Sequence, residues 1–371
     1  MRVFYFITKS EQGGAQTVIF ELLKKHKERN DFVCVMAEGE NWLAQKTKEL
    51  GFHYKQNDYM VKTYNPLVLF HAALKYRKAI KEFSPDIVSC HSSFSGFVGR
   101  FSLLNEYPVV YTAHGWGFTD GTSRVRKIIS IIGEKTAGFF CKKIICVSFF
   151  DKKNALRYHI VPKNKMVVIQ NGVSIENRQT YYEKNKIVEI IFVARFALPK
   201  QQMLLLEAFK LLPHSVQEKS HITFVGDGLS KQAVLDYSIE HNLQKFVTFT
   251  HSLSRDGALD CMQKSDLFVL LSLWEGLPMS VIEAMQIGLP VVVSDVCGIA
   301  EIVDASVGTL VDNKDIDMIA KTLESFIVNV EKREKIGNSA RIKGLLFNAE
   351  RMSNEVFYLY DEIYKNYKHL T

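Results

Sequence analysis

Short apolar runs alternate with longer segments of helical periodicity along the whole chain. Near-continuous apolar runs are typical of parallel strands that are buried on both faces. In the first half such runs predict strands at 2–8, 32–37, 86–91, 108–114, 143–148 and 166–170. Apolar residues at helical spacing predict helices at 15–29 and 67–83.

The second half repeats this scheme. It predicts strands at 189–195, 221–226, 246–250, 266–272, 290–294 and 308–311, and helices at 200–212, 231–241, 255–264, 279–287 and 315–330. This alternation predicts an α/β fold with two doubly wound, Rossmann-like sheets facing each other across a cleft. Ligands of such sheets bind beyond the carboxyl ends of the strands.

The length of 371 residues agrees with two domains. We expect a first domain at 1–171, a polar linker at 172–186 and a second domain at 187–350. The apolar and aromatic positions of 353–371 predict a final helix that packs back on the first domain. Because no apolar run reaches membrane-spanning length and the N-terminus lacks signal-peptide features, we expect neither a spanning helix nor a leader.

Charge is divided unevenly between the two halves. Residues 1–180 hold 27 basic and 15 acidic residues, a net +12, whereas 181–371 carry −5. The first half therefore faces an anionic partner, such as nucleic acid, a phosphorylated substrate or a membrane surface, or it is a solvated basic surface. The six cysteines form no C-x-x-C pair and are expected to be buried free thiols in a reducing cytoplasm (Cys34, Cys90, Cys141, Cys146, Cys261 and Cys297).

Candidate ligand-binding residues of the first half follow its strands. Gly13 and Gly14 come between the first strand and the first helix, where backbone N–H groups attract phosphate. The segment is not G-x-G-x-x-G, which disfavours a dinucleotide cofactor, and an ordinary tight turn is the alternative. His114 ends a buried strand at the expected ligand edge. The alternative for His114, and for His91 on the neighbouring strand, is a hydrogen-bonded core histidine.

In the second half, basic residues and glycines also follow the predicted strands, at the expected ligand-binding edge of the sheet. Arg195 and Lys200 span a strand-to-helix turn and could clamp a diphosphate. The turn Gly226-Asp227-Gly228 ends the next strand. Each of these signals is weak by itself.

The most specific segment is Glu275-Gly276-Leu277-Pro278-Met279-Ser280-Val281-Ile282-Glu283. Glu275 lies on a loop, and Glu283 lies among apolar residues of a helix, where a carboxylate needs a partner. Two such carboxylates suit adjacent hydroxyl groups, as on a sugar and a ribose. The alternative for Glu283 is an exposed position on the helix.

Two further segments resemble functional motifs. Asp315-Ile316-Asp317 has the D-x-D form of some metal sites, but its place before a helix favours an N-cap, and we expect no metal site. Residues 124–132 begin a basic amphipathic helix. This helix either rests on a membrane or packs its apolar face on the core.

Taken in order, these motifs resemble the retaining nucleotide-sugar glycosyltransferases of family four, which have the two-Rossmann GT-B fold. The likeness covers nearly the whole chain. It is carried by Gly13-Gly14-Ala15, His114-Gly115-Trp116, Val147-Ser148, Asn171-Gly172-Val173, Arg195 with Lys200, Gly226-Asp227-Gly228, Glu275 with Glu283-Ala284-Met285, and Gly288-Leu289-Pro290-Val291-Val292. Two departures are Gln16, where an acidic residue is common, and Pro278, which has no N–H to donate.

The resemblance implies roles for these residues. Arg195 and Lys200 would bind the diphosphate, Glu283 the ribose, and Glu275 the donor sugar, with His114 near the reacting carbon. The catalytic set would be His114, Arg195, Lys200 and Glu275. The donor would also contact Gly13, Gly14, Gly226, Asp227, Gly228, Gly276, Leu277, Met279 and Ser280.

The implied activity is metal-independent retaining transfer of a hexose or N-acetylhexosamine from a UDP-sugar. The acceptor would be a polyprenyl-diphosphate-linked glycan in capsule, O-antigen or exopolysaccharide synthesis. We expect a cytoplasmic enzyme held peripherally on the inner face of the membrane by anionic lipid, with no cofactor besides the nucleotide sugar and no nucleic-acid partner. The alternatives are a nucleotide-sugar epimerase on the same fold and a non-enzymatic protein that binds anionic surfaces.

Overall fold

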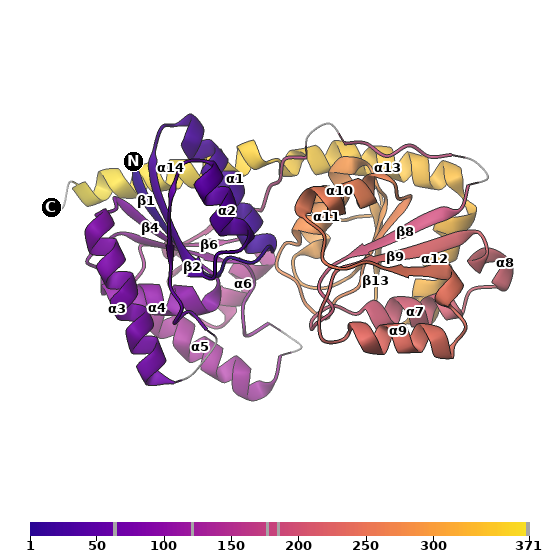
Figure 1. Cartoon of the computed structure of the whole chain (residues 1–371), viewed down its shortest axis with the longest axis horizontal. Helices are drawn as coiled ribbons and strands as arrows, with labels where there is room; N and C mark the ends of the chain where they lie inside the picture. The colour runs from indigo at the N-terminus through magenta and orange to yellow at the C-terminus, as the bar shows by residue number, and fades with distance from the viewer. Residues whose placement is uncertain (62–64, 120–121, 176–177, 184–185, 369–371) are drawn as a thin grey trace. The chain divides into compact units, whose positions relative to one another are not determined.

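The computed structural model describes residues 1–61, 65–119, 122–175, 178–183 and 186–368, and it divides into two compact units (Figure 1). Unit 1 comprises Met1–Val173 and Asn348–Thr371, and unit 2 comprises Ser174–Phe347. Each unit has one sheet of parallel strands with helices packed on it. Within the described residues, no helix combines the length and the apolar character needed to cross a membrane.

The sheet of unit 1 has the strand order β3-β2-β1-β4-β5-β6-β7. Its strands are β1 (Arg2–Lys9), β2 (Phe32–Glu38), β3 (His53–Gln56), β4 (Ile87–His91), β5 (Val109–Ala113), β6 (Lys143–Cys146) and β7 (Met166–Val168). The polar edge strand β3 was not predicted, because its sequence lacks an apolar run.

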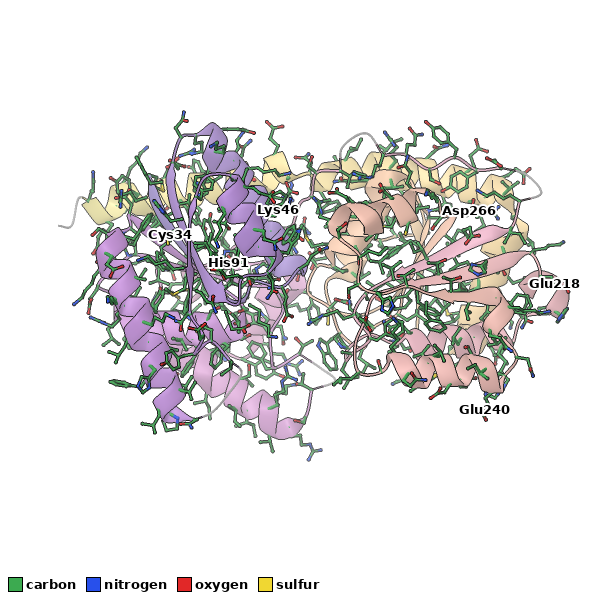
Figure 2. All side chains as sticks on the ribbon, viewed as in Figure 1. Cys34, Lys46, His91, Glu218, Glu240 and Asp266 are labelled. Carbon is green, nitrogen blue, oxygen red and sulfur yellow. The ribbon has the colours of Figure 1, made fainter. Side chains whose placement is uncertain are left out.

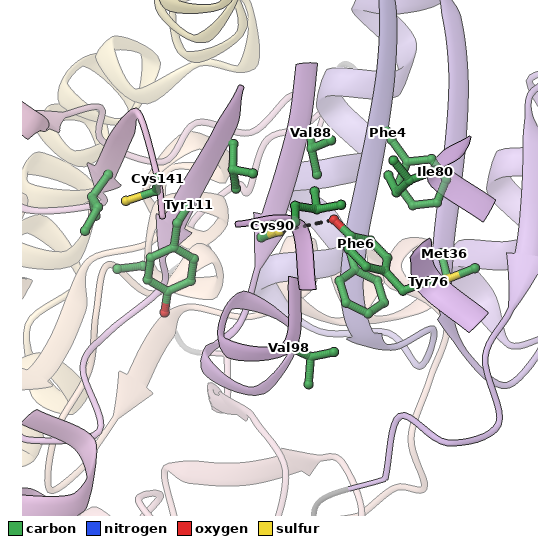
Figure 3. Close-up of a cluster of buried hydrophobic side chains, with 14 of the residues drawn as sticks. Phe4, Phe6, Met36, Tyr76, Ile80, Val88, Cys90, Val98, Tyr111 and Cys141 are labelled. Carbon is green, nitrogen blue, oxygen red and sulfur yellow. Dashed lines mark hydrogen bonds between the residues drawn. The ribbon is translucent and has the colours of Figure 1, made fainter. Parts of the chain in front are cut away.

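Helices cover both faces of this sheet. They are α1 (Gly14–Glu28), α2 (Trp42–Glu49), α3 (Pro66–Phe83), α4 (Ser93–Leu103), α5 (Arg124–Gly138), α6 (Phe149–Arg157) and α14 (Ala349–Lys368). Alternate strand residues point to opposite faces. Phe6 and Cys90 join α3 and α4 in one core cluster, where the phenol of Tyr76 lies near Cys90 (Figure 3).

Unit 2 repeats the design with the strand order β10-β9-β8-β11-β12-β13. Its strands are β8 (Val188–Val193), β9 (Ser220–Val225), β10 (Val247–Phe249), β11 (Leu267–Leu270), β12 (Val291–Ser294) and β13 (Gly308–Val311). Its helices are α7 (Gln202–Lys210), α8 (His214–Gln217), α9 (Lys231–Glu240), α10 (Arg255–Gln263), α11 (Met279–Ile287), α12 (Ile316–Val328) and α13 (Val330–Gly344). The fold class expected from the sequence, α/β with two Rossmann-like domains, is confirmed.

Each sheet has a point where the strand order reverses. In unit 1 it lies between β1 and β4, and in unit 2 between β8 and β11. Doubly wound sheets bind ligands beyond the carboxyl ends of the strands at such a point. The loops after these strands are therefore the expected ligand-binding positions of each unit.

The boundary between the two units lies inside the expected linker, after Val173. The expected linker, 172–186, belongs to unit 2 from Ser174 onward, where Thr180 N donates to Ile287 O (3.1 Å) and the Tyr182 hydroxyl donates to Gly288 O (2.6 Å). Residues 176–177 and 184–185 of that segment, and 369–371 of the expected final helix, lie outside the described residues.

Burial of the cysteines also differs in part from the expectation. All six are free thiols, and Cys34, Cys90, Cys141 and Cys146 are buried. The expectation of burial is wrong for Cys261 and Cys297, which are half-exposed because they lie in the solvent-facing α10 and in the loop after β12.

Candidate active site

The loop after β8 is held against the glycine turn that follows β9. Phe196 N donates to Asp227 O at 2.9 Å, and Ser230 N donates to Phe196 O at 3.0 Å. Arg195 lies on this loop and is exposed at the carboxyl edge of the sheet. The backbone contacts thus fix the place from which its guanidinium can reach a ligand.

The close approach of these loops requires glycine at two positions. Gly226 and Gly228 have φ values of +147° and +145°. A Cβ atom on Gly226 would lie 2.1 Å from Ala194 O, and one on Gly228 would lie 2.4 Å from Phe196 O. Both conformation and space therefore exclude a side chain here.

Asp227, between these glycines, is exposed and interacts with two basic side chains. Its carboxylate lies 3.3 Å from Nδ1 of His251 and 3.6 Å from Nζ of Lys231. The hydrogen bond with His251 is the largest of the effects that hold the pKa of Asp227 below its usual value.

Lys200 and Glu275 form an ion pair between the loops that follow the two central strands of unit 2. Nζ of Lys200 donates to Oε1 of Glu275, and their side chains are only 18% and 11% exposed. The backbones are joined as well, since Gln201 N donates to Leu271 O and Leu273 N donates to Pro199 O, both at 2.9 Å. A sequence-predicted cation and carboxylate are thus brought together at the switch point.

Helix α11 begins directly after this loop, with Pro278 as its N-cap and no side-chain cap. The first N–H groups of a helix have no partner within the helix and favour an anion, so those of Met279 and Ser280 suit a phosphate. Leu277 is buried, and Gly276 lies between it and Glu275. The segment predicted to be most specific therefore adjoins the Lys200–Glu275 pair.

Glu283 is 8% exposed, so the interpretation that it is buried is confirmed. Its Oε1 accepts a hydrogen bond of 2.9 Å from Nε of Arg255, the first residue of α10. Arg255 also donates from Nη2 to Ser174 O at 3.1 Å. Sequence reasoning missed Arg255, because nothing in the pattern of the chain pairs residue 255 with residue 283.

In unit 1, Gly13 is the N-cap of α1. Its φ of −177° is extended backbone that any residue adopts, so the conformation does not require glycine. The side-chain amide of Gln16 donates to Lys9 O at 2.9 Å, which fixes the turn before Gly14. The helix start has no side-chain cap and keeps its N–H groups for other acceptors.

His114 lies beyond the end of β5 and is partly exposed. Its Nε2 is 2.9 Å from Nδ1 of His91, and the two rings stack with centroids 5.2 Å apart. Burial lowers the pKa of His114 to about 4 and lowers that of His91 well below its usual value. Both rings are therefore neutral at pH 7 and share one N–H···N hydrogen bond.

The structure thus gathers the predicted residues at two sheet edges. Unit 2 brings Arg195, Lys200, Glu275 and the start of α11 to one edge, and unit 1 carries Gly13, Gly14 and His114. Asp315 lies elsewhere and caps α12, accepting from Met318 N at 2.8 Å, so its interpretation as a cap is confirmed. Within the described part of the chain, no group of three or more His, Cys, Asp or Glu residues is placed to hold a metal ion.

Two Rossmann-like units of this design define the GT-B class of glycosyltransferase. The structure superposes with a TM-score of 0.82 on that of Anabaena HepE, which was crystallised in complex with UDP and glucose. The alignment covers 98% of this chain and 100% of that one, at 17% sequence identity.

Sequence comparison identifies the family. Residues 12–177 match Glycosyltransferase Family 4, and residues 174–343 match Glycosyl transferases group 1. The chain is 30% identical to the O-antigen biosynthesis glycosyltransferase WbnH of Escherichia coli, over 85% of this chain and 87% of that protein. It is also 30% identical to an Escherichia coli UDP-Gal:alpha-D-GlcNAc-diphosphoundecaprenol alpha-1,3-galactosyltransferase, over 66% of this chain and 67% of that protein. The chain belongs to the family 4 glycosyltransferases.

Proposed function

We propose that the protein transfers a hexose or N-acetylhexosamine from a UDP-sugar, with retention of the anomeric configuration, to a polyprenyl-diphosphate-linked glycan. The Lys200–Glu275 pair at the switch point of unit 2 carries the donor half of this proposal. A cation beside an uncapped helix start suits a diphosphate, and the adjoining carboxylate suits sugar hydroxyls.

The ammonium of Lys200 can donate to a diphosphate and to Glu275 at the same time. It has three N–H donors, and the ion pair uses one of them. Arg195 adds a second cation from the neighbouring loop. Glu283, oriented by Arg255, would accept hydrogen bonds from the ribose hydroxyls. Each proposed group of the nucleotide sugar therefore has a partner of matching chemistry in unit 2.

The same groups suit the transfer step. As the bond between the sugar and the diphosphate breaks, negative charge grows on the leaving oxygen, and Lys200 and Arg195 stabilise it. That oxygen can accept the proton of the incoming acceptor hydroxyl on the same face of the sugar, which gives retention without a protein base. Support for retention comes from the relative that forms an alpha-1,3 linkage from UDP-Gal, because UDP-galactose is itself an α-glycoside.

The acceptor is inferred from the relatives and from the surface of unit 1. One relative is named for O-antigen biosynthesis, and another for an acceptor on diphosphoundecaprenol. A lipid-linked acceptor requires access to a membrane surface. We therefore propose a cytoplasmic enzyme that binds the inner membrane face peripherally, and helix α5 supports this.

Helix α5 exposes apolar side chains beside basic ones. Val125, Ile128, Ile129 and Ile132 are 69%, 58%, 51% and 58% exposed, and Arg124 and Arg126 are exposed next to them. The alternative of a core-facing apolar stripe is wrong for this part of the helix, because α5 anchors to the core through its last turns, where Glu134 pairs with buried Arg100. An exposed apolar face with basic flanks is typical of helices that lie in a lipid interface.

Three other basic residues, Lys127, Lys142 and Lys143, do not extend this face. Lys127 places its ammonium 5.2 Å above the ring of Tyr158. Lys142 and Lys143 lie beyond the other end of α5, about 22 Å from its start, and Lys143 donates to Asn164 O at 2.9 Å. The proposed lipid contact is therefore the apolar face of α5 with Arg124 and Arg126.

A donor and acceptor screen tests the proposed function. UDP- and GDP-sugars are incubated with the protein and a membrane-lipid extract, and release of free nucleoside diphosphate is measured with and without the extract. We expect UDP release from one UDP-sugar, stimulated by the extract, and an α-linked product by NMR. Interconversion of the nucleotide sugar without release would instead indicate an epimerase, and no reaction with any donor would contradict the proposal.

A further inference from the structure

A line of hydrogen bonds inside unit 1 connects the C-terminal helix to His114. The hydroxyl of Tyr360 in α14 donates to Oγ of Ser89 at 2.7 Å, and that Oγ lies 3.0 Å from Nε2 of His91. Nδ1 of His91 is 2.9 Å from Nε2 of His114. Tyr360 and Ser89 are fully buried, and His91, labelled in Figure 2, lies in the interior of unit 1.

The fold brings these four residues together from distant parts of the sequence. Ser89 and His91 are two residues apart on β4, so both side chains point to the same face of the sheet. Helices α1 and α14 pack against each other in this unit, and α14 supplies Tyr360. Residue 360 thus reaches residue 89 across 271 positions of sequence.

The donors and acceptors along this line have a direction. Ser89 Oγ accepts the proton of Tyr360, and its own buried proton then needs an acceptor. Because the Tyr360 hydroxyl acts as the donor to Ser89, the acceptor that the structure places beside the serine proton is His91 Nε2. His91 must therefore carry its proton on Nδ1 and donate it to His114 Nε2, which places the proton of neutral His114 on Nδ1.

We propose that Ser89, which accepts a hydrogen bond from Tyr360, is a positioning residue that acts through His91 to hold His114 in its Nδ1–H tautomer. His114 then presents a hydrogen-bond donor to an oxygen atom of the nucleotide sugar, rather than an acceptor. The role of His114 toward the sugar rests on the proposed function, whereas the tautomer follows from the contacts within unit 1. The opposite tautomer would make His91 a second donor to Ser89 and leave the serine proton without an acceptor.

The tautomer can be measured without any substrate. The full-length protein, labelled with ¹⁵N-histidine, is compared by long-range ¹H–¹⁵N NMR with Ser89→Ala, and His114→Ala assigns the signals. The matched control is Ser102→Ala, another buried serine of unit 1, which donates to Val98 O. We expect a protonated Nδ1 and an unprotonated Nε2 on His114 in the wild type and the control, and a mixture in Ser89→Ala. A protonated Nε2 in the wild type, or no change in Ser89→Ala, would overturn the proposal.

Kinetics test whether the tautomer matters for transfer. With the UDP-sugar identified by the screen, we expect Ser89→Ala to lower kcat about tenfold, the effect of a donor no longer held in place. In a His114→Ala background, Ser89→Ala should have no further effect. Independent, multiplying losses would show that Ser89 acts on folding instead and would overturn the proposal. Ser89→Cys, which carries a weaker donor of similar size, provides a second test if Ser89→Ala unfolds, and an inactive wild type would count against the proposed function while leaving the NMR result valid.

Discussion

Arg255 and Glu283 join the start of α10 to the middle of α11 through a 2.9 Å hydrogen bond between Nε and Oε1. Their side chains are 12% and 11% exposed, so the pair is largely withdrawn from water. A carboxylate in such a place keeps its charge and its orientation only with a partner. Arg255 therefore determines how Glu283 is presented to a ligand, although it lies 28 residues earlier in the chain.

The first prediction follows from this pair. Arg255→Ala should destabilise the protein by roughly 1–3 kcal/mol, because it leaves the Glu283 carboxylate without its charged hydrogen bond. It should also raise KM for the UDP-sugar more than it lowers kcat, since a ribose contact acts in binding. The control is Arg178→Ala, which removes more exposed ion pairs to Asp256 and Asp260 of the same helix. Equal nucleotide affinity in both variants would show that Arg255 does not orient Glu283 for binding the ribose.

The second prediction concerns the proposed diphosphate site. Lys200→Ala and Arg195→Ala should each lower turnover by ~10²–10³, the loss expected when one charge-stabilising donor is removed. Steady-state UDP release measures this, and Lys210→Ala, an exposed lysine at the end of α7, is the matched control. Near-normal turnover in both folded variants would rule out the assignment of Lys200 and Arg195 to the diphosphate.

The third prediction concerns metal ions. We expect transfer to survive a chelator, because the proposed chemistry gives the leaving-group charge to Lys200 and Arg195. Asp315→Ala should cost about 1 kcal/mol of stability through the lost N-cap of α12 and leave turnover unchanged. Thermal unfolding and UDP release measure the two effects. Loss of activity in chelator that Mn²⁺ or Mg²⁺ restores would contradict this prediction.

The fourth prediction concerns acid. The pKa of His114 is lowered to about 4 by burial, and burial also lowers the pKa values of His91 and His26. In the unfolded chain these groups take up protons below about pH 6.5, whereas in the folded protein they remain neutral. Stability should therefore fall as the pH drops from about 6.5 toward 4.

Thermal unfolding between pH 7 and pH 4.5 tests whether stability falls as the pH drops. His91→Gln should show a smaller fall of the melting temperature over that range than the wild type, whatever its stability at pH 7. His241→Gln, at the half-buried C-cap position of α9, is the control and should keep the wild-type slope. A slope that is the same in all three proteins would show that the buried histidines do not titrate as expected.

The fifth prediction concerns lipid. The protein should sediment with anionic liposomes, and each basic residue near the surface should contribute about 1 kcal/mol at low salt. Arg124→Ala/Arg126→Ala should weaken binding at low salt, and Ile128→Ser/Ile129→Ser should remove the part that persists at high salt. Donor hydrolysis should be unchanged in both, because none of these four residues is among the proposed donor-binding groups. Equal sedimentation with neutral and anionic liposomes would contradict a role for the basic residues.

The sequence by itself determined the alternation of strands and helices, and with it the α/β class and both Rossmann-like sheets. It did so because strands buried on both faces must be apolar along their length, as in Val291–Ser294. It also located the residues that follow the strands, such as Arg195 and Glu275, since loops after parallel strands gather at one edge. The sequence pattern did not predict polar or weakly periodic elements, among them β3 and α13.

Tertiary structure alone decided the partners of these residues. Lys200 meets Glu275, Arg255 meets Glu283, and Tyr360 reaches Ser89 across long separations in the sequence. No local pattern encodes such pairs, because each depends on which helix packs on which face of a sheet. The direction of the hydrogen bonds that reach His114 likewise arises from burial, which leaves each polar proton with few acceptors.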